Sequence, residues 1–222
     1  MVFKMIQQRI FAGTAFRPRP KVIADVKSRR LTVITRWSGD LSIESLASKL
    51  DDFLNISVDL DVTKISGMDP VAAPEFNEKL NSSLKSANEI VLSEYNSVYL
   101  KHLVEVSIFQ KVDQQLHWAC CSDLTVAARQ GNRLMLLSAS ESAVPEASPL
   151  PLNALGVSAE ISVSAGTCDL KGVDSLVLVA CSFNQQELLK TFEGDFKQLE
   201  SALIESDYQS PFWLAEIPLR GF

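Results

Sequence analysis

Cysteine supplies nucleophiles and metal ligands, and this chain has few candidates for either role. Its four cysteines include no C-x-x-C pair of the kind that binds zinc. They are Cys120, Cys121, Cys168 and Cys181. Cys120 and Cys121 are adjacent, so on a strand they would point to opposite faces and would not pair with each other. We interpret all four as reduced thiols in the core of a cytosolic protein.

The two histidines, His102 and His117, both fall in segments that we predict to be strands. We expect each of them in the core or on a strand face rather than in a catalytic centre. The chain contains no G-x-S-x-G elbow, Walker loop or dinucleotide-binding fingerprint. An acidic group formed by Glu44, Asp51 and Asp52 is most simply the solvent face of a helix.

The composition is that of an ordinary soluble globule, with 222 residues, 46% apolar and 22% charged. The net charge of -6 argues against nucleic acid or an anionic membrane as a partner. No apolar run approaches the roughly 20 residues that span a bilayer, and charges interrupt residues 1–10, which is not typical of a signal peptide. We therefore expect one cytoplasmic domain, residues 1–222.

Residues 99–138 carry the strongest strand signal, with apolar and β-branched runs separated by short polar breaks. We interpret this stretch as an antiparallel meander, and its run Leu116 to Cys121 as a strand buried on both faces. Further strands are predicted at 1–14, 21–26, 31–35, 159–165, 174–181 and 212–217. Apolar residues at three- and four-residue steps predict helices at 41–55 and 74–95, with shorter ones at 185–192 and 196–204 and a surface loop at 139–151.

A meander needs a second layer to cover its apolar face. The order of strands, two helices, many strands, two helices and a last strand favours an α+β protein. We predict a four-layer α-β-β-α sandwich of two antiparallel sheets flanked by helices.

Several local motifs resemble those of the metal-dependent type 2C Ser/Thr protein phosphatases, the PPM family, in the same order along nearly the whole chain. The segment from Cys120 to Arg129, with Gly131, resembles the family's N-x-G-D-S-R-A strand and turn. The other matches are Ile34 to Gly39 with V-A-D-G-M-G-G, Leu46 to Lys49 with the following A-S helix, Ala87-Asn88 and Ile90 with A-N..I, Leu155 to Val157 with A-L-G, Asp174 to Ser182 with the strand before S-D-G, and Gln186 to Leu188 with the helix after it.

The resemblance implies the fold but argues against the activity. Phosphatases of this family hold two Mn²⁺ or Mg²⁺ ions with carboxylates, and the ions activate a water. Here the bridging aspartate of D-G is replaced by Arg36, and S-D-G is replaced by Ser182, Phe183 and Asn184. The N-terminal acidic pair falls near Lys21 and Val22. Only Asp123 and Asp207 remain as matches.

The resemblance makes Arg17 a candidate phosphate-gripping residue, with a solvated loop arginine as the alternative. Arg36 either replaces the metal charge by pairing with Asp123 or Asp207, or binds a phosphorylated ligand without cleaving it. Asp123 is most simply a cap or turn residue after Cys121. Trp37 and Phe183 are expected to plug a degenerate cleft that also includes Asn184, Asp123 and Asp207.

We expect a pseudophosphatase that acts by binding, with no cofactor and a protein partner such as a phosphoprotein, a kinase, or part of a bacterial signalling or secretion assembly. One alternative is an active phosphatase that uses Mn²⁺ or Mg²⁺ at an atypical site, with Asp25 facing Asp207. Another is a structural homodimer formed through an exposed sheet edge.

Overall fold

The structure is a computed structural model, and it describes residues 4–9, 20–25, 29–39, 48, 73–96, 102–138, 151, 153–181, 196–198 and 212–219. The chain divides into two compact units. One comprises Met1–Pro18, Asp123–Leu150 and Lys171–Phe222, and the other comprises Arg19–Ser122 and Pro151–Leu170. Each unit is built on one five-stranded sheet. Whether residues 1–222 act as a single domain stays a prediction.

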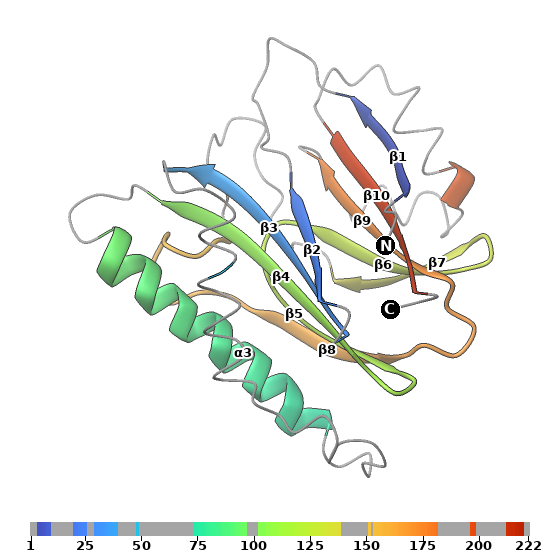
Figure 1. The fold of residues 1–222 in the computed structure, drawn as a ribbon, viewed down its shortest axis with the longest axis horizontal. Helices are drawn as coiled ribbons and strands as arrows, with labels where there is room; N and C mark the ends of the chain where they lie inside the picture. The colour runs from blue at the N-terminus through green and yellow to red at the C-terminus, as the bar shows by residue number, and fades with distance from the viewer. Residues whose placement is uncertain are drawn as a thin grey trace. The chain divides into compact units, whose positions relative to one another are not determined.

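The sheet of the second unit has the order β2-β3-β4-β5-β8, and every neighbouring pair is antiparallel (Figure 1). Its strands are β2 (Lys21–Asp25), β3 (Arg30–Ser38), β4 (Leu103–Val112), β5 (Gln115–Cys121) and β8 (Ser164–Asp169). The strands predicted at 21–26 and 31–35 are confirmed as β2 and β3, which pair as an antiparallel hairpin. Residues 116–121 are buried throughout, as their continuous apolar run predicts.

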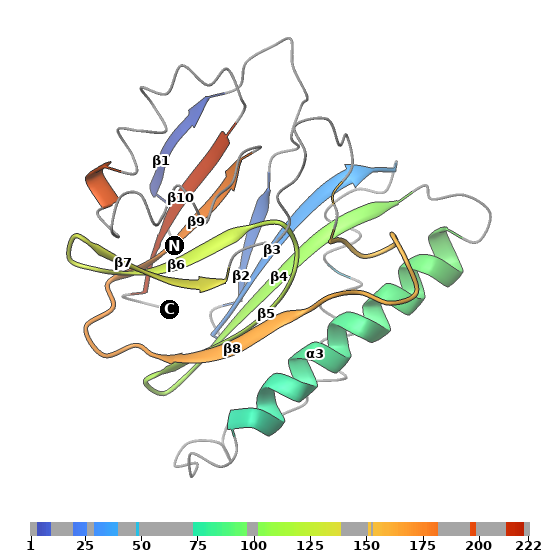
Figure 2. The ribbon, with the colours of Figure 1, turned by 180° about the vertical axis from the view of Figure 1, so that it is seen from behind.

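Helix α3 (Ala73–Ile90) continues into a π-helical turn at Val91–Tyr95, so the helix predicted at 74–95 is confirmed. It lies along the sheet of the second unit in both ribbon views (Figures 1 and 2). Its apolar residues recur every three or four positions and therefore form one stripe. That stripe packs on one face of the sheet in a single core cluster, which comprises Phe76, Leu80, Leu84, Ala87, Val91, Ile34, Val104, Val106, Ile108, Ala119, Cys121 and Leu155.

The sheet of the first unit has the order β1-β10-β9-β6-β7. Its strands are β1 (Lys4–Arg9), β10 (Phe212–Pro218), β9 (Ser175–Cys181), β6 (Thr125–Gln130) and β7 (Arg133–Ser138). The strand predicted at 174–181 is confirmed as β9, which lies between β10 and β6 with antiparallel pairing on both sides. Of the strand predicted at 1–14, residues 4–9 are described, and they form β1 at the end of the strand order.

The prediction of one continuous meander over residues 99–138 is wrong. β4 and β5 pair in one sheet, whereas β6 and β7 pair in the other. The chain changes sheets at the polar break Ser122-Asp123, and the Ser122 hydroxyl is buried and hydrogen-bonded to that of Ser107 at 2.7 Å. Apolar patterning predicts that a strand forms, but it does not identify the strand that becomes its neighbour.

The strand predicted at 159–165 begins five residues later than expected, as β8 at Ser164. β8 pairs with β5 in a register that sets Gly166 opposite Trp118. A Cβ at position 166 would overlap the indole ring, so the absent side chain of Gly166 makes room for Trp118. This packing depends on a distant strand, and the alternation within 159–165 gives no sign of it.

Several predicted elements lie outside the described residues. They are the helix at 185–192, the helix at 41–55 apart from Ser48, and most of the loop at 139–151. Of the helix predicted at 196–204, residues 196–198 are described and helical. None of the helices in the described part of the chain is both long enough and apolar enough to cross a membrane.

Candidate functional site

The end of β3 is where the resemblance places the bridging aspartate of the metal site. Here Arg36 and Trp37 are followed by Ser38, and the pairing with β4 becomes irregular between Arg36 and Ser38. The indole Nε1 of Trp37 donates a hydrogen bond of 2.8 Å to Oε2 of Glu105 on β4. Glu105 is only 2% exposed. A buried carboxylate therefore lies at this strand end, and a protein N–H group binds it.

The sheet register separates Arg36 from Glu105. Arg36 pairs with Val104 and follows Ile34 by two positions, and both apolar residues belong to the core cluster beneath α3. Strand alternation therefore places Arg36 on the α3 side of the sheet. Glu105 pairs with Thr35 and lies on the opposite side. The proposed phosphate-binding or charge-replacing role of Arg36 stays a prediction.

Gly39 ends the strand with a φ of +98°, a conformation that favours glycine. A Cβ at this position would overlap the imidazole of His102. His102 is buried, and its backbone N–H and C=O both bond to the side chain of Asn96, at 2.7 and 2.8 Å. The expectation of a core histidine is confirmed for His102 by its burial, although the residue lies just before β4 and not within a strand.

The remaining predicted cleft residues are only partly described. Asp123 is 2% exposed and lies two residues after the end of β5. Arg17, Phe183, Asn184 and Asp207 lie outside the described residues, so their roles stay predictions.

The described residues do not fit a two-metal site. Within the described ranges, no three His, Cys, Asp or Glu side chains are grouped so that they could hold a metal ion. A binuclear Mn²⁺ or Mg²⁺ site needs several oxygen ligands in one place. At the end of β3, Glu105 supplies one carboxylate, and Trp37 already donates to it. This part of the chain therefore supports no metal-dependent step.

Two of the resembling motifs meet in the second unit. Oδ1 of Asn88 on α3 accepts a hydrogen bond of 2.8 Å from the backbone N–H of Gly156, and Nδ2 of Asn88 donates to the carbonyl of Ser158 at 2.8 Å. Next to this contact, Leu155 forms a two-bond antiparallel bridge with Val104. The A-N motif and the L-G motif therefore share a structural task, which is to fix α3 to the segment at 155–158.

His117 also joins α3 to the sheet. Its Nδ1 lies 3.3 Å from Oδ1 of Asn77 on α3 and 3.1 Å from Oγ1 of Thr167 on β8. The Asn77 amide donates to the same Thr167 oxygen at 2.9 Å, and Phe76 packs against the ring at a centroid distance of 4.6 Å. Burial lowers the pKa of His117 below its ordinary value. Both polar contacts use the same ring nitrogen, so they hold the imidazole in place and do not form a proton relay.

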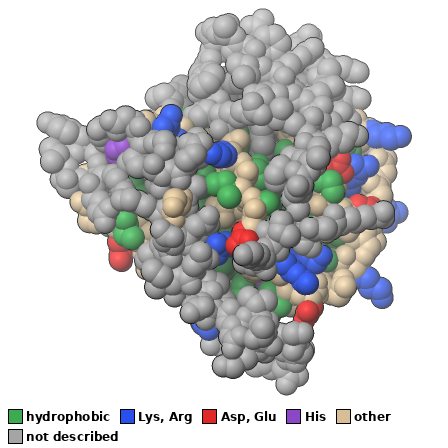
Figure 3. All heavy atoms as spheres, in the orientation of Figure 1, with side chains coloured by type: hydrophobic (Ala, Val, Ile, Leu, Met, Phe, Trp, Pro, Cys, Tyr) green, Lys and Arg blue, Asp and Glu red, His purple; other side chains and the backbone are tan. Residues whose placement is uncertain are grey.

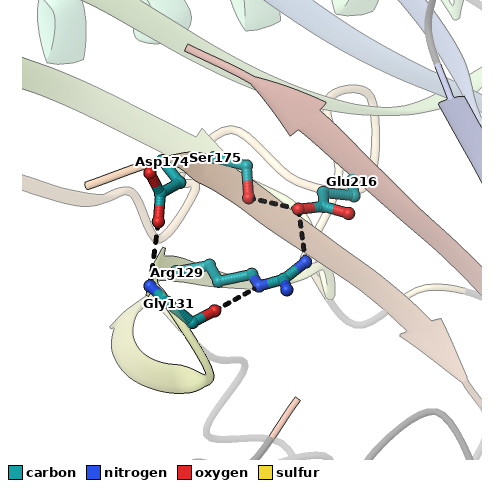
Figure 4. Close-up of polar contacts among 5 residues, drawn as sticks. All are labelled: Arg129, Gly131, Asp174, Ser175 and Glu216. Carbon is teal, nitrogen blue, oxygen red and sulfur yellow. Dashed lines mark hydrogen bonds and ion pairs between the residues drawn. The ribbon is translucent and has the colours of Figure 1, made fainter. Parts of the chain in front are cut away.

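A second polar cluster lies in the first unit, where β9 begins and β10 ends (Figure 4). The Arg129 guanidinium donates to Oε1 of Glu216 at 2.6 Å and, through Nε, to the carbonyl of Gly131 at 2.7 Å. Ser175 donates to the same Glu216 oxygen at 2.6 Å, and Asp174 accepts from the Gly131 N–H at 2.9 Å. These bonds fix the β6–β7 turn to β9 and β10.

Sequence reasoning missed both Glu105 and the Arg129–Glu216 pair. In each case a signal was present, because a glutamate stands within an apolar strand run, at Leu103 to Phe109 and at Phe212 to Ile217. A charged residue at such a position is seldom buried without a partner. The partners, Trp37 and Arg129, are 68 and 87 positions away in sequence, so the pairing could not be predicted from local pattern.

The fold of this chain is that of the metal-dependent Ser/Thr protein phosphatases, as the resemblance predicts: α+β, with two antiparallel sheets. No protein-family model matches the sequence, and no curated protein matches it. The likeness to solved structures, in contrast, extends over almost the whole chain.

Three similar proteins illustrate this likeness. The Ser/Thr phosphatase Stp1 from Staphylococcus aureus aligns with a TM-score of 0.57 at 13% identity, covering 98% of this chain and 96% of its own. The Ser/Thr phosphatase PstP from Mycobacterium tuberculosis aligns with a TM-score of 0.54 at 11% identity, with 97% of each chain covered. PppA, a regulatory component of the type VI secretion system in Pseudomonas aeruginosa, gives 0.52 at 16%, with 90% of each covered. Another PstP structure is a complex with two manganese ions. Identities this low establish the fold alone.

Proposed function

We propose that this protein is a catalytically inactive relative of the Ser/Thr phosphatases that acts as a binding or regulatory module in protein-phosphorylation signalling. The observation that carries the proposal is the end of β3. The position that resembles a metal-bridging aspartate holds Arg36, and the next residue, Trp37, uses its indole N–H to bind the buried Glu105.

The chemistry of the replaced positions supports this proposal. A guanidinium repels a divalent cation, and the phenyl ring of Phe183 in place of the S-D-G aspartate has no lone pair to offer. Among the residues that the structure describes, no cluster of ligands compensates for these losses. The phosphatase fold nevertheless extends over nearly the whole chain. A fold that is kept without the metal ligands supports a recognition role. We propose a phosphoprotein or a kinase as the partner.

Phosphoester hydrolysis tests the proposal. The purified full chain is incubated with p-nitrophenyl phosphate and a phosphothreonine peptide, with Mn²⁺, with Mg²⁺ and with a chelator. We expect the same background rate in all three conditions, because no binuclear site activates a water. A Mn²⁺-dependent rate that Asp123→Asn or Asp207→Asn abolishes would contradict the proposal and favour an atypical active phosphatase. The matched control is Lys85→Glu, a change on the exposed face of α3.

A further inference from the structure

The outermost strand of the first unit's sheet, β7, exposes apolar side chains. Met135 and Leu136 are 49% and 41% exposed, and they are the exposed large hydrophobic residues of the described part of the chain. They are adjacent on the strand, so they lie on opposite faces of the sheet edge. β7 is last in the strand order, and from Leu134 to Leu137 it contains no charge and no proline to block a further strand.

Cations gather at the end of the sheet where β7 begins. Arg133 starts the strand, and hydrogen bonds bring two other segments to the same turn: Asp174 donates from its backbone to Arg129, and Phe196 donates to Asn132, at 2.8 and 3.0 Å. We name the cations of these segments the basic cluster: Arg129 and Arg133 flank the turn, Lys171 lies three residues before Asp174, and Lys197 follows Phe196. In the view of Figure 3, Lys and Arg side chains lie along the right-hand edge of the molecule, with some Asp and Glu side chains among them.

The side chains of the basic cluster are positively charged, whereas the chain as a whole has a net charge of -6. Among the described residues, two carboxylates form hydrogen bonds at this turn. Glu216 bonds to Arg129 and Ser175, and Asp174 bonds to the Gly131 N–H. Arg133 and Lys197 are both exposed, and the Arg129 side chain is 24% exposed while it stacks on the ring of Phe196 at 4.3 Å. An anionic group near the start of β7 would therefore meet the exposed Arg133 beside the apolar edge.

We propose that β7 is a docking edge for an extended segment of a partner protein, in which alternating apolar residues are followed by acidic ones. Such a segment adds a strand through main-chain hydrogen bonds. Every neighbouring pair in this sheet is antiparallel. An antiparallel segment therefore ends beside Arg133, and its acidic residues come last. A second copy of β7 fits less well, because Arg133 to Ser138 contains a cation and no acid.

This proposal rests on the binding role proposed above and names a partner chemistry for it. The probe is a fluorescein-labelled peptide, Thr-Val-Thr-Val-Thr-Val-Asp-Glu-Asp, titrated with the full chain without metal or phosphoester and followed by anisotropy. A peptide that does not bind would overturn the docking edge but would not change the hydrolysis result. The docking edge and the inactive binding role can therefore be rejected separately. Replacing the acids with Asn-Gln-Asn is expected to weaken binding at least about fivefold. Equal binding of both peptides would overturn the proposal.

Two changes separate edge pairing from charge attraction. N-methylation of the peptide on alternate residues keeps its charge but removes N–H donors, and we expect it to abolish binding. In the protein, Arg133→Glu is expected to weaken binding at least about fivefold, whereas the matched Lys85→Glu on α3 leaves it unchanged. Circular dichroism and thermal midpoints verify that both variants fold.

Either of two other outcomes would overturn the proposal. One is full-strength binding of the methylated peptide, which would reduce the site to charge alone. The other is a concentration-dependent dimer in sedimentation that Leu136→Lys abolishes, which would make a second copy the occupant.

Discussion

At Gly156 the backbone has a φ of +88°, and a Cβ there would overlap the carbonyl oxygen of His102 and the amide of Asn96. The Gly156 N–H is in turn bound by Asn88. The residue is therefore constrained twice, once by its backbone conformation and once by close contacts. Each constraint alone disfavours any side chain.

Gly156→Ala is expected to lower the free energy of unfolding by at least about 3 kcal/mol, because conformational strain and overlap with backbone add. Gly131→Ala is the matched control, since its φ is +59° but nothing lies within 4 Å of the added Cβ. Gly131→Ala should lower the free energy of unfolding by only about 1 kcal/mol. Urea unfolding of the two variants measures both values, and equal losses would refute the role of the contacts.

Among the elements, α3 is held to its sheet by an apolar stripe and by two polar anchors. Asn88 binds the segment at 156–158, and the Asn77–His117–Thr167 group joins α3 to β5 and β8. The second anchor contains a titratable group that is 4% exposed. Charging His117 would require hydration that this site does not provide.

Folding should therefore depend on pH through His117. Burial lowers its pKa in the folded state, so the unfolded chain binds the proton first. The stabilisation is complete above about pH 6.5, the unfolded value, and is lost as the pH falls toward the lower folded value, at up to about 1.4 kcal/mol per pH unit. The check is urea unfolding of the wild type and His117→Gln between about pH 7.5 and about pH 5. Subtracting the unfolding free energies of the two proteins removes the contributions of other titrating groups. Parallel plots of unfolding free energy against pH would mean that His117 does not cause the pH dependence.

The elements themselves could be predicted largely from the sequence, because their signals are local. The stripe of Phe76, Leu80 and Leu84 predicts α3, and the apolar runs predict β5 and β9. Sheet membership could not be predicted, since β6 follows β5 after a short break yet pairs with β9. At the candidate site the motif order located Arg36 and Trp37 at a strand end. It could not locate Glu105, whose contact with Trp37 forms only when β3 and β4 pair.

For the whole molecule, the fold and the resemblance, which sets Arg36 and Phe183 at metal-ligand positions, make opposite predictions about metal binding. The alignment with Stp1 covers 98% of this chain, and a structure of PstP is a complex with two manganese ions. A chain that kept such a site would gain stability from Mn²⁺, because a ligand that binds only the folded state stabilises it. A chain with Arg36 and Phe183 at those positions should gain none.

Thermal unfolding with and without Mn²⁺ distinguishes these cases without an activity assay. A retained site at a hundredfold excess of metal over its Kd would raise Tm on the order of 5 to 10 °C for a chain of this length. We expect no rise beyond that given by Mg²⁺ or by NaCl of equal ionic strength, which control for screening of the net charge of -6. A Mn²⁺-specific rise that disappears in Asp123→Asn or Asp207→Asn would mean that carboxylates of this chain still bind the ion, and it would contradict the proposal that the metal site is lost.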